Sequence, residues 1–198
     1  MKPFVLGLTG SIGTGKSTAS AMFAEAGLPI WDADAAVHRL YAENGGGAQA
    51  LASDFPEAIA AGAVSREALK RILAADPSRL ARLEQIIHPM VSADRKKFVA
   101  QTKSDIVVLD IPLLFETGAE AECDATLLIT APADLQKARV MARPGMTDQQ
   151  FSLILSRQLS EQEKRTRATH IVETLSFDST RSYIQALIAY ILAGRKDA

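Results

Sequence analysis

The sequence has little cysteine, no long apolar run and almost no excess charge of either sign. It contains a single cysteine, Cys123, so the chain cannot form a disulfide framework of its own. No stretch approaches the ~20 consecutive apolar residues that a membrane-spanning helix requires. The formal net charge of -1 lacks the strong basic excess of a general nucleic-acid binder. These absences exclude a scaffold held together by disulfides. They also predict that the partners include neither a membrane nor a nucleic acid.

The first ten residues combine a lysine with an apolar run, which superficially resembles a signal peptide. The run is too short for that role, and the glycines at 10, 13 and 15 interrupt it. A single cysteine also fits a reducing compartment. The sequence therefore predicts a cytoplasmic protein.

Five short apolar runs are typical of strands buried on both faces of a parallel sheet. The first two flank a helix predicted over residues 16–26, which makes a strand–helix–strand unit. Residues 47–102 have a helical pattern without a convincing strand. Capping-box sequences at Thr147–Gln150 and Ser160–Glu163 predict the starts of two later helices. The five predicted strands are residues 4–9, 28–31, 106–109, 126–129 and 171–172.

A glycine-rich stretch follows the first predicted strand. Gly10–Ser17 has the sequence GSIGTGKS and fits the Walker A pattern G-x-x-x-x-G-K-[ST], with a strand before it and a helix after it. Glycines let the backbone amides wrap a phosphate, and the helix that begins at Lys16 adds its positive end. The loop is therefore predicted to hold the phosphates of a nucleoside triphosphate, with these contact residues: Ser11, Ile12, Gly13, Thr14, Gly15, Lys16, Ser17 and Thr18.

Three residues, two in this loop and one at the end of a strand, are expected to act on the phosphates and their metal. Lys16 is predicted to reach the β- and γ-phosphates, and the Ser17 hydroxyl is predicted to bind Mg²⁺. Asp110 ends the third strand in the position of a Walker B aspartate, where it can hold Mg²⁺ directly or through water. The predicted fold class is thus α/β, a three-layer P-loop NTPase fold with about five parallel strands.

Three classes of P-loop protein compete for this chain: a switch GTPase, a motor ATPase and a small-molecule kinase. Thr102–Asp105 has the letters of a guanine-reading motif, but it precedes a strand and is predicted to be a solvated turn. Motor ATPases are usually larger. A basic helical segment suits the lid of a kinase, and Arg139 and Arg143 lie on one face of its first helix. Such a lid supplies positive charge and excludes water.

Two aspartates follow the second strand, at the sheet edge where ligands of open α/β sheets bind. A carboxylate there can orient an acceptor hydroxyl and accept its proton. We expect Asp34 to have this role, whereas Asp32 serves either this function or the capping of a helix.

Four blocks together resemble the dephospho-CoA kinase family. They are GLTGSIGTGKST at 7–18, WDAD at 31–34, HPMV at 88–91 and LDIPLLFE at 109–116, and they span much of the chain. The resemblance implies transfer of the γ-phosphate of ATP to the ribose 3′-hydroxyl of dephospho-CoA, the last step of coenzyme A biosynthesis. It implies ATP as co-substrate, Mg²⁺ as cofactor, dephospho-CoA as the other small-molecule partner and no obligate protein partner.

The resemblance also implies residue roles and a domain layout. Asp34 corresponds to the base, Arg139 and Arg143 to the lid arginines, and His88, Leu113 and Glu116 to the acceptor side. We expect one domain, 1–198, that carries a substrate-side helical insertion at about 36–103 and a helical lid at about 132–167. Its core takes about 1–35, 104–131 and 168–198.

One stretch departs from the family pattern. Residues 171–176 read IVETLS, where family members often have a V-I-D-N-x-G-like stretch close to the adenine, so the adenine contacts of this chain are not predicted. Two other functions stay open on the sequence: a nucleoside or nucleotide kinase on the same fold, and a nucleotide-dependent switch or binding module.

Overall fold

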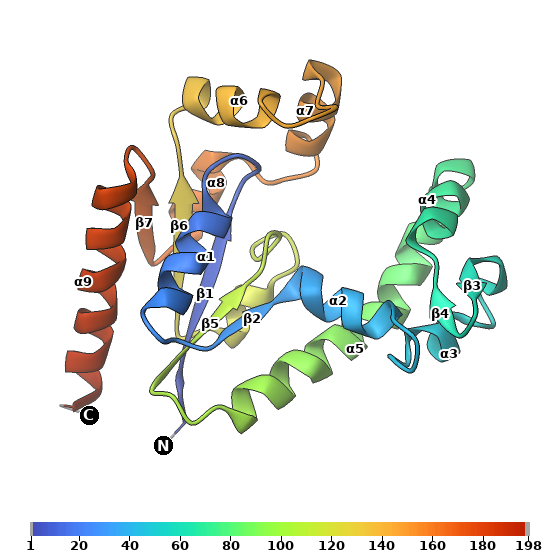
Figure 1. Ribbon diagram of the computed structural model, residues 1–198, viewed down its shortest axis with the longest axis horizontal. Coiled ribbons are helices and arrows are strands. Elements are labelled where there is room, and N and C mark those ends of the chain that lie inside the picture. The colour runs from blue at the N-terminus through green and yellow to red at the C-terminus, as the bar shows by residue number, and fades with distance from the viewer. Residues whose placement is uncertain (1, 197–198) are drawn as a thin grey trace. The chain divides into compact units, whose positions relative to one another are not determined.

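The computed structural model describes residues 2–196, which divide into two compact units (Figure 1). The first unit comprises the chain up to Trp31 and from Thr102 onward, and the second comprises Asp32–Gln101. The predicted helical insertion therefore falls largely within the second unit, which begins at Asp32 rather than at about residue 36. Within the described range, no helix is both long and apolar enough to cross a membrane.

The first unit is built on a five-stranded sheet in the order β2-β5-β1-β6-β7. β1 pairs in parallel with β5 and β6, and β6 pairs in parallel with β7. This arrangement confirms the predicted α/β class and places the strand that leads into the glycine loop at the centre. The strands are β1 (Phe4–Gly10), β2 (Ile30–Asp32), β5 (Ile106–Asp110), β6 (Ala125–Thr130) and β7 (His170–Glu173).

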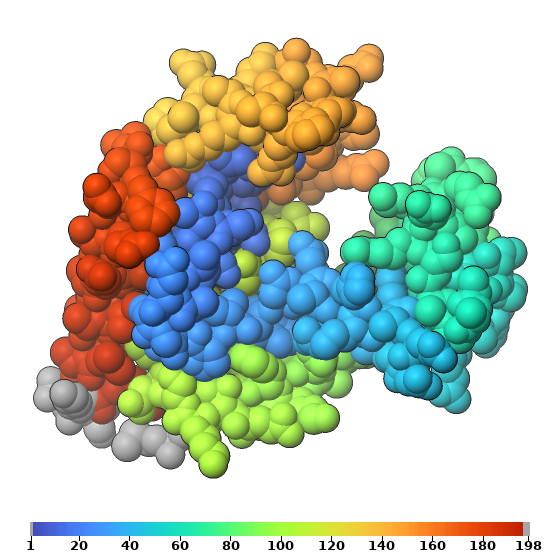
Figure 2. Space-filling model, viewed as in Figure 1, coloured from blue at the N-terminus to red at the C-terminus, as the bar shows by residue number. Residues whose placement is uncertain are grey.

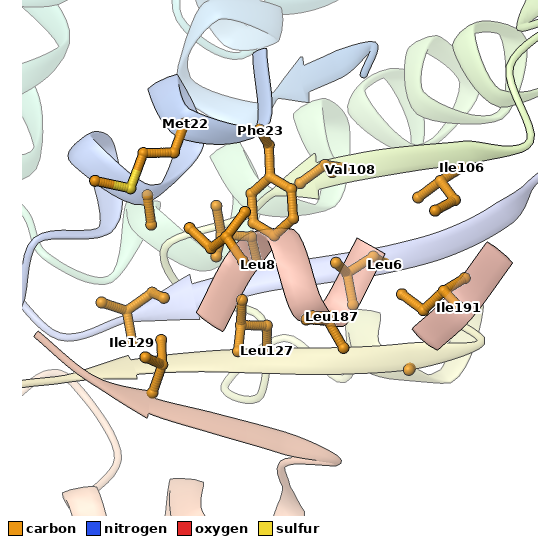
Figure 3. Close-up of a cluster of buried hydrophobic side chains, with 14 residues drawn as sticks. Leu6, Leu8, Met22, Phe23, Ile106, Val108, Leu127, Ile129, Leu187 and Ile191 are labelled. Carbon is orange, nitrogen blue, oxygen red and sulfur yellow. The ribbon is translucent and has the colours of Figure 1, made fainter. Parts of the chain in front are cut away.

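An apolar core holds helices against one face of this sheet. Figure 3 shows Phe23 of α1 and Leu187 of α9 over Leu6 and Leu8 of β1. Nearly every residue of β1, β5 and β6 is buried, because the opposite face is covered as well. This two-sided burial explains why the strands appear in the sequence as continuous apolar runs. The helices of this unit are α1 (Lys16–Glu25), α6 (Ala133–Met141), α7 (Asp148–Leu155), α8 (Glu161–Arg167) and α9 (Phe177–Lys196), with a 3-10 turn at Ala119–Glu122.

The second unit is mainly helical and has an apolar core of its own. Leu51, Phe55, Leu69 and Leu83 belong to one buried cluster. The prediction of no strand here was wrong, because β3 and β4 form a small antiparallel hairpin. Its strands are two residues long, which is too short for an alternating pattern to be recognised. The elements are α2 (Ala33–Tyr41), α3 (Gly47–Leu51), a 3-10 turn (Pro56–Ala58), β3 (Ile59–Ala60), β4 (Ala63–Val64), α4 (Arg66–Ala75) and α5 (Arg79–Gln101).

Candidate functional site: a phosphate loop and its supports

The glycine loop makes a tight turn between β1 and α1. The backbone amide and hydroxyl of Thr14 both donate to the carbonyl of Ser11, at 3.2 and 2.8 Å. Gly13 has φ +81°, and a Cβ built on it would lie 2.4 Å from Cγ2 of Val140 in α6. Glycine is therefore required at this position both for the backbone angle and for the close approach of a helix.

The N-terminus of α1 is open to an anion. Gly15 precedes the helix in a left-handed conformation, and within residues 2–196 no side chain caps this end. The first turn also contains no acidic residue. Backbone amides at a helix N-terminus have no intrahelical acceptor, and the helix dipole favours a negative charge beside them. The loop thus has the geometry that the Walker A pattern predicts for a phosphate.

Lys16 and Asp110 come together at this end of the sheet. The Lys16 ammonium forms an ion pair with Oδ1 of Asp110, whose side chain is only 3% exposed. Their contact follows from the parallel pairing of β1 with β5, which sets Leu8 opposite Asp110. Two predicted site residues that are far apart in the sequence are therefore neighbours in the fold.

The oxygen atoms near this ion pair suit a magnesium ion. Ser17 follows Lys16 directly and is exposed, so its hydroxyl and the Asp110 carboxylate supply the two kinds of oxygen that Mg²⁺ binds. Among the residues that the structure describes, no group of three or more His, Cys, Asp or Glu residues forms a metal site.

The predicted lid segment is attached to the outside of the loop. Gln136 of α6 donates from Nε2 to the carbonyl of Ile12 at 2.7 Å, and the Ile12 amide donates to Oε1 of Gln158 at 3.3 Å. In the space-filling view, the yellow and orange residues of this segment cover the blue N-terminal loop (Figure 2). The backbone N–H and C=O of Ile12 are thereby both bonded to lid residues.

Arg139 lies against the loop backbone, and Arg143 does not. The Arg139 guanidinium donates to the hydroxyl and carbonyl oxygens of Thr174, at 2.8 and 2.9 Å, and more weakly to the carbonyl of Thr14 at 3.4 Å. The Thr174 hydroxyl in turn donates to the Thr14 carbonyl at 2.6 Å. Arg143 is exposed and lies beyond α6, which ends at Met141, so the expectation that the two arginines share one helix face was wrong.

Thr174 was not predicted as a site residue. The only sequence signal was its place in the IVETLS stretch, which departs from the family pattern. In the structure Thr174 joins the phosphate loop, α6 and β6. Besides its bonds to Thr14 and Arg139, its hydroxyl lies 3.2 Å from the carbonyl of Thr130 in β6. A threonine hydroxyl with these partners stabilises the loop through the carbonyl of Thr14.

Glu116 lies near the phosphate loop, and its carboxylate is bonded to other residues of this chain. Its Oε1 accepts from the Leu159 amide at 2.9 Å and lies 3.0 Å from the ammonium of Lys164. Lys164 is 0% exposed and also donates to the hydroxyl of Ser11 at 3.2 Å. Leu113, three residues before Glu116, is 40% exposed. Lys164 was recognised in the sequence only as one basic residue of the lid segment.

The remaining predicted residues belong to the second unit. Asp34 is exposed in the first turn of α2, and His88 is exposed within α5. Asp32 is the N-cap of α2, where its Oδ1 accepts from the Ala35 amide at 2.7 Å. Of the two roles considered for Asp32, the capping role is therefore seen in the structure.

The two capping boxes predicted in the lid segment are confirmed. Thr147 begins α7 and Ser160 begins α8, each with reciprocal side-chain and backbone bonds. The donors of Ser160 hold the pKa of the Glu163 carboxyl below its ordinary value. On the neighbouring α6, the Asp148 carboxylate raises the pKa of the Lys137 ammonium. Local sequence therefore fixes where these lid helices start.

Comparison with known proteins links this site to one family. The sequence model of the family described as dephospho-CoA kinase matches residues 4–177. The chain is 59% identical to a dephospho-CoA kinase of Cereibacter sphaeroides over 191 residues, which make up 96% of this chain and 97% of that relative.

Solved structures agree with the fold. A crystal structure of TT1252 from Thermus thermophilus matches with a TM-score of 0.84 and 35% identity, over 96% of this chain and 98% of that one. A dephospho-CoA kinase from Campylobacter jejuni matches with a TM-score of 0.72 and 24% identity over the same shares of the two chains, which supports the fold alone.

Proposed function

The chain belongs to the dephospho-CoA kinase family, and from that premise we propose that it transfers the γ-phosphate of ATP to the ribose 3′-hydroxyl of dephospho-CoA. The products are CoA and ADP. The observation that carries this proposal is the 59% identity to a curated dephospho-CoA kinase over nearly the full length of both chains. The structure supports the ATP half, because it contains a phosphate loop with an uncapped helix end and a lysine beside it.

The nucleotide phosphates are assigned to the loop. Residues 11–18, chiefly through the amides at the start of α1, and the ammonium of Lys16 hold them, and Lys16 stabilises the charge that spreads over the γ-phosphoryl group during transfer. Ser17 and Asp110 are the proposed protein ligands of Mg²⁺, which when bound supplies positive charge to the β- and γ-phosphates. The exposed hydroxyl of Ser17 and the carboxylate of Asp110 support that assignment.

The proposal also assigns four residues to the acceptor. Asp34 orients the acceptor hydroxyl and takes its proton as the new bond to phosphorus forms. In this proposal His88 and Leu113 contact dephospho-CoA, and Glu116, whose Oε1 is bonded to Leu159 and Lys164, supports the acceptor side. The exposure of Asp34, His88 and Leu113 supports it, since each side chain is open to a ligand.

The two lid arginines are proposed to act differently. Arg143 is exposed and supplies positive charge to the transferring phosphoryl group. Arg139 supports the phosphate loop through Thr14 and Thr174 and adds its charge from the side of the loop backbone. The proposed partners are two small molecules, ATP and dephospho-CoA, and the proposed compartment is the cytoplasm.

A coupled ADP-release assay tests the proposed function. MgATP is supplied alone, with dephospho-CoA, with adenosine and with AMP, and CoA formation is followed by mass spectrometry. We expect ADP release that depends on dephospho-CoA and matches the CoA formed. Release that follows adenosine or AMP instead would indicate a nucleoside or nucleotide kinase. Tight ADP binding without transfer to any of these acceptors would indicate a nucleotide-dependent switch.

A further inference from the structure

Lys164 is a lysine whose side chain is completely buried. At 0% exposure its ammonium has lost its contact with water, and it lies 3.0 Å from Oε1 of Glu116. A buried charge is costly unless it is paired and hydrogen-bonded. Replacing such a pair by apolar residues is often neutral or stabilising, so fold stability alone does not account for a lysine here. A functional role of this ammonium would explain its burial, and its contacts indicate which role.

The ammonium joins the phosphate loop to the segment that follows β5. It donates to the Ser11 hydroxyl at 3.2 Å, and Ser11 is the second residue of the Walker A sequence. Glu116 lies six residues after Asp110, the residue that pairs with Lys16. One buried cation thus connects the two segments whose other ends are connected by the Lys16–Asp110 pair.

The start of α8 and the turn before it strengthen this connection. The Leu159 amide donates to the same Glu116 oxygen at 2.9 Å, and Gln158 accepts from the Ile12 amide at 3.3 Å. Residues 158–164 therefore hold two successive loop residues, Ser11 and Ile12, by side-chain bonds. Neither bond uses the amides of the first turn of α1, which are the proposed phosphate ligands.

We propose that Lys164 is a positioning residue for phosphoryl transfer, which fixes the phosphate loop and the Glu116 segment relative to each other through Ser11 and Glu116. The proposal rests on the proposed function, because the loop must be the site of the transferred phosphate. Enzymes accelerate phosphoryl transfer mainly by positioning and charge, and small misplacements of the reacting groups are costly in rate. Lys164 acts through its two partners and has no assigned contact with either substrate.

The first test is the Lys164→Met variant, assayed well below its melting temperature and normalised to folded protein. We expect kcat to fall about 10- to 100-fold, the cost of a small misplacement of reacting groups, while KM for ATP changes less than about threefold. We also expect the Ile12 amide to exchange with solvent at least about tenfold faster, with β6 amides unchanged. A lower melting temperature with unchanged kcat and unchanged Ile12 exchange would show a purely structural ion pair and overturn the proposal.

A second variant avoids a buried unpaired carboxylate. Ser11→Ala keeps the Lys164–Glu116 pair and removes only the hydroxyl that the ammonium reaches, so it is expected to fold normally. Its kcat should fall about three- to tenfold, since one positioning bond is lost. Lys164→Arg keeps a cation and should recover part of the kcat that Lys164→Met loses. Wild-type kcat in Ser11→Ala, or equal losses in Lys164→Met and Lys164→Arg, would contradict the proposal.

Lys137→Met is the matched control. Lys137 also belongs to the lid segment and forms an ion pair, with Asp148 at 2.7 Å, but its side chain is 57% exposed. We expect its kcat to equal that of the wild type, and a loss as large as that of Lys164→Met would overturn the proposal. Turnover of the wild-type protein tests the proposed kinase function separately from the role of Lys164. If the wild type does not turn over dephospho-CoA, the proposed function fails. The Ile12 exchange still decides the role of Lys164 in that case.

Discussion

The two units of the protein treat charge in different ways. The first unit encloses the Lys164–Glu116 and Lys16–Asp110 pairs, in which one partner of each is at most 3% exposed. The second unit carries ion pairs such as Arg82–Asp54, with side chains 56% and 29% exposed. Exposed pairs contribute little because water screens them, whereas enclosed ones hold their groups in fixed geometry. The first unit therefore holds two charge pairs in its interior, beside exposed pairs such as Lys137–Asp148, whereas the pairs Arg82–Asp54 and Arg39–Asp94 of the second unit lie at its surface.

The largest effect should come from the charge at the centre of the first unit. Lys16→Ala removes the ammonium from the phosphate loop, and we expect turnover to fall at least about 100- to 1,000-fold because the transition-state charge loses a direct partner. The ADP-release assay measures this. Lys103→Ala, at an exposed lysine in the turn before β5, is the control and should retain wild-type turnover. Comparable turnover in the two variants would remove Lys16 from the proposed chemistry.

The next prediction tests whether the second unit contributes a reacting group. Asp34 and Asp134 are each the second residue of a nine-residue helix, and both are exposed. We expect Asp34→Asn to lower kcat about 100-fold, the lower end of the range for a lost general base, with ADP affinity unchanged. Asp134→Asn makes the same chemical change in the first unit and should leave kcat near wild type.

Steady-state kinetics and calorimetric titration with ADP measure both effects. Near wild-type turnover of Asp34→Asn would disprove its assignment as the base. An equal loss in both aspartate variants would instead point to a general effect of charge on the two helix starts.

A third prediction compares the two apolar cores. Phe23 and Phe55 are fully buried in separate clusters, one in each unit. We expect Phe23→Ala and Phe55→Ala each to cost about 3–5 kcal/mol of unfolding free energy in its own unit, because each leaves a large cavity. Only Phe23→Ala should weaken ADP binding, since the loop residues that we propose to hold phosphate all belong to the first unit.

Urea unfolding followed by circular dichroism gives the stabilities, and ADP titration at 10 °C gives the affinities. A Phe55→Ala protein that is folded but binds ADP more than about tenfold more weakly would show that the second core supports the nucleotide site. A tenfold loss of ADP affinity is larger than the energetic coupling expected between distant, independent sites.

The two units also differ in how much of their structure could be predicted from the sequence. The sheet and the Walker A loop were predictable, because buried parallel strands are continuous apolar runs and a phosphate loop needs glycines at fixed spacing. The β3–β4 hairpin was not, since two-residue strands carry no periodic signal. Asp110 was predicted from its place at a strand end, and the structure sets it beside Lys16.

The supports of the loop were harder to predict than the loop itself. Lys164 and Thr174 bond to Ser11 and Thr14 across more than 150 residues of sequence. Their side chains belong to common residue types, and a lysine in a basic helix is most often solvated. Such long-range polar contacts depend on the packed tertiary structure, and local sequence patterns carry little information about them.

The smallest effect should come from the Thr174 hydroxyl, which supports the loop without enclosing a charge pair. Thr174→Val keeps the shape of the side chain but removes the donor to the Thr14 carbonyl at 2.6 Å and an acceptor of Arg139 at 2.8 Å. We expect a loss of about 1–3 kcal/mol in unfolding free energy, as for a buried polar group left unsatisfied, and a fewfold weaker binding of ADP. Thr174→Ser keeps the hydroxyl and should stay within about 1 kcal/mol of the wild type, less than the valine variant loses. Urea unfolding and ADP titration compare the two, and equal behaviour of valine and serine would show that methyl packing, and not the hydroxyl, is what this residue contributes behind the loop.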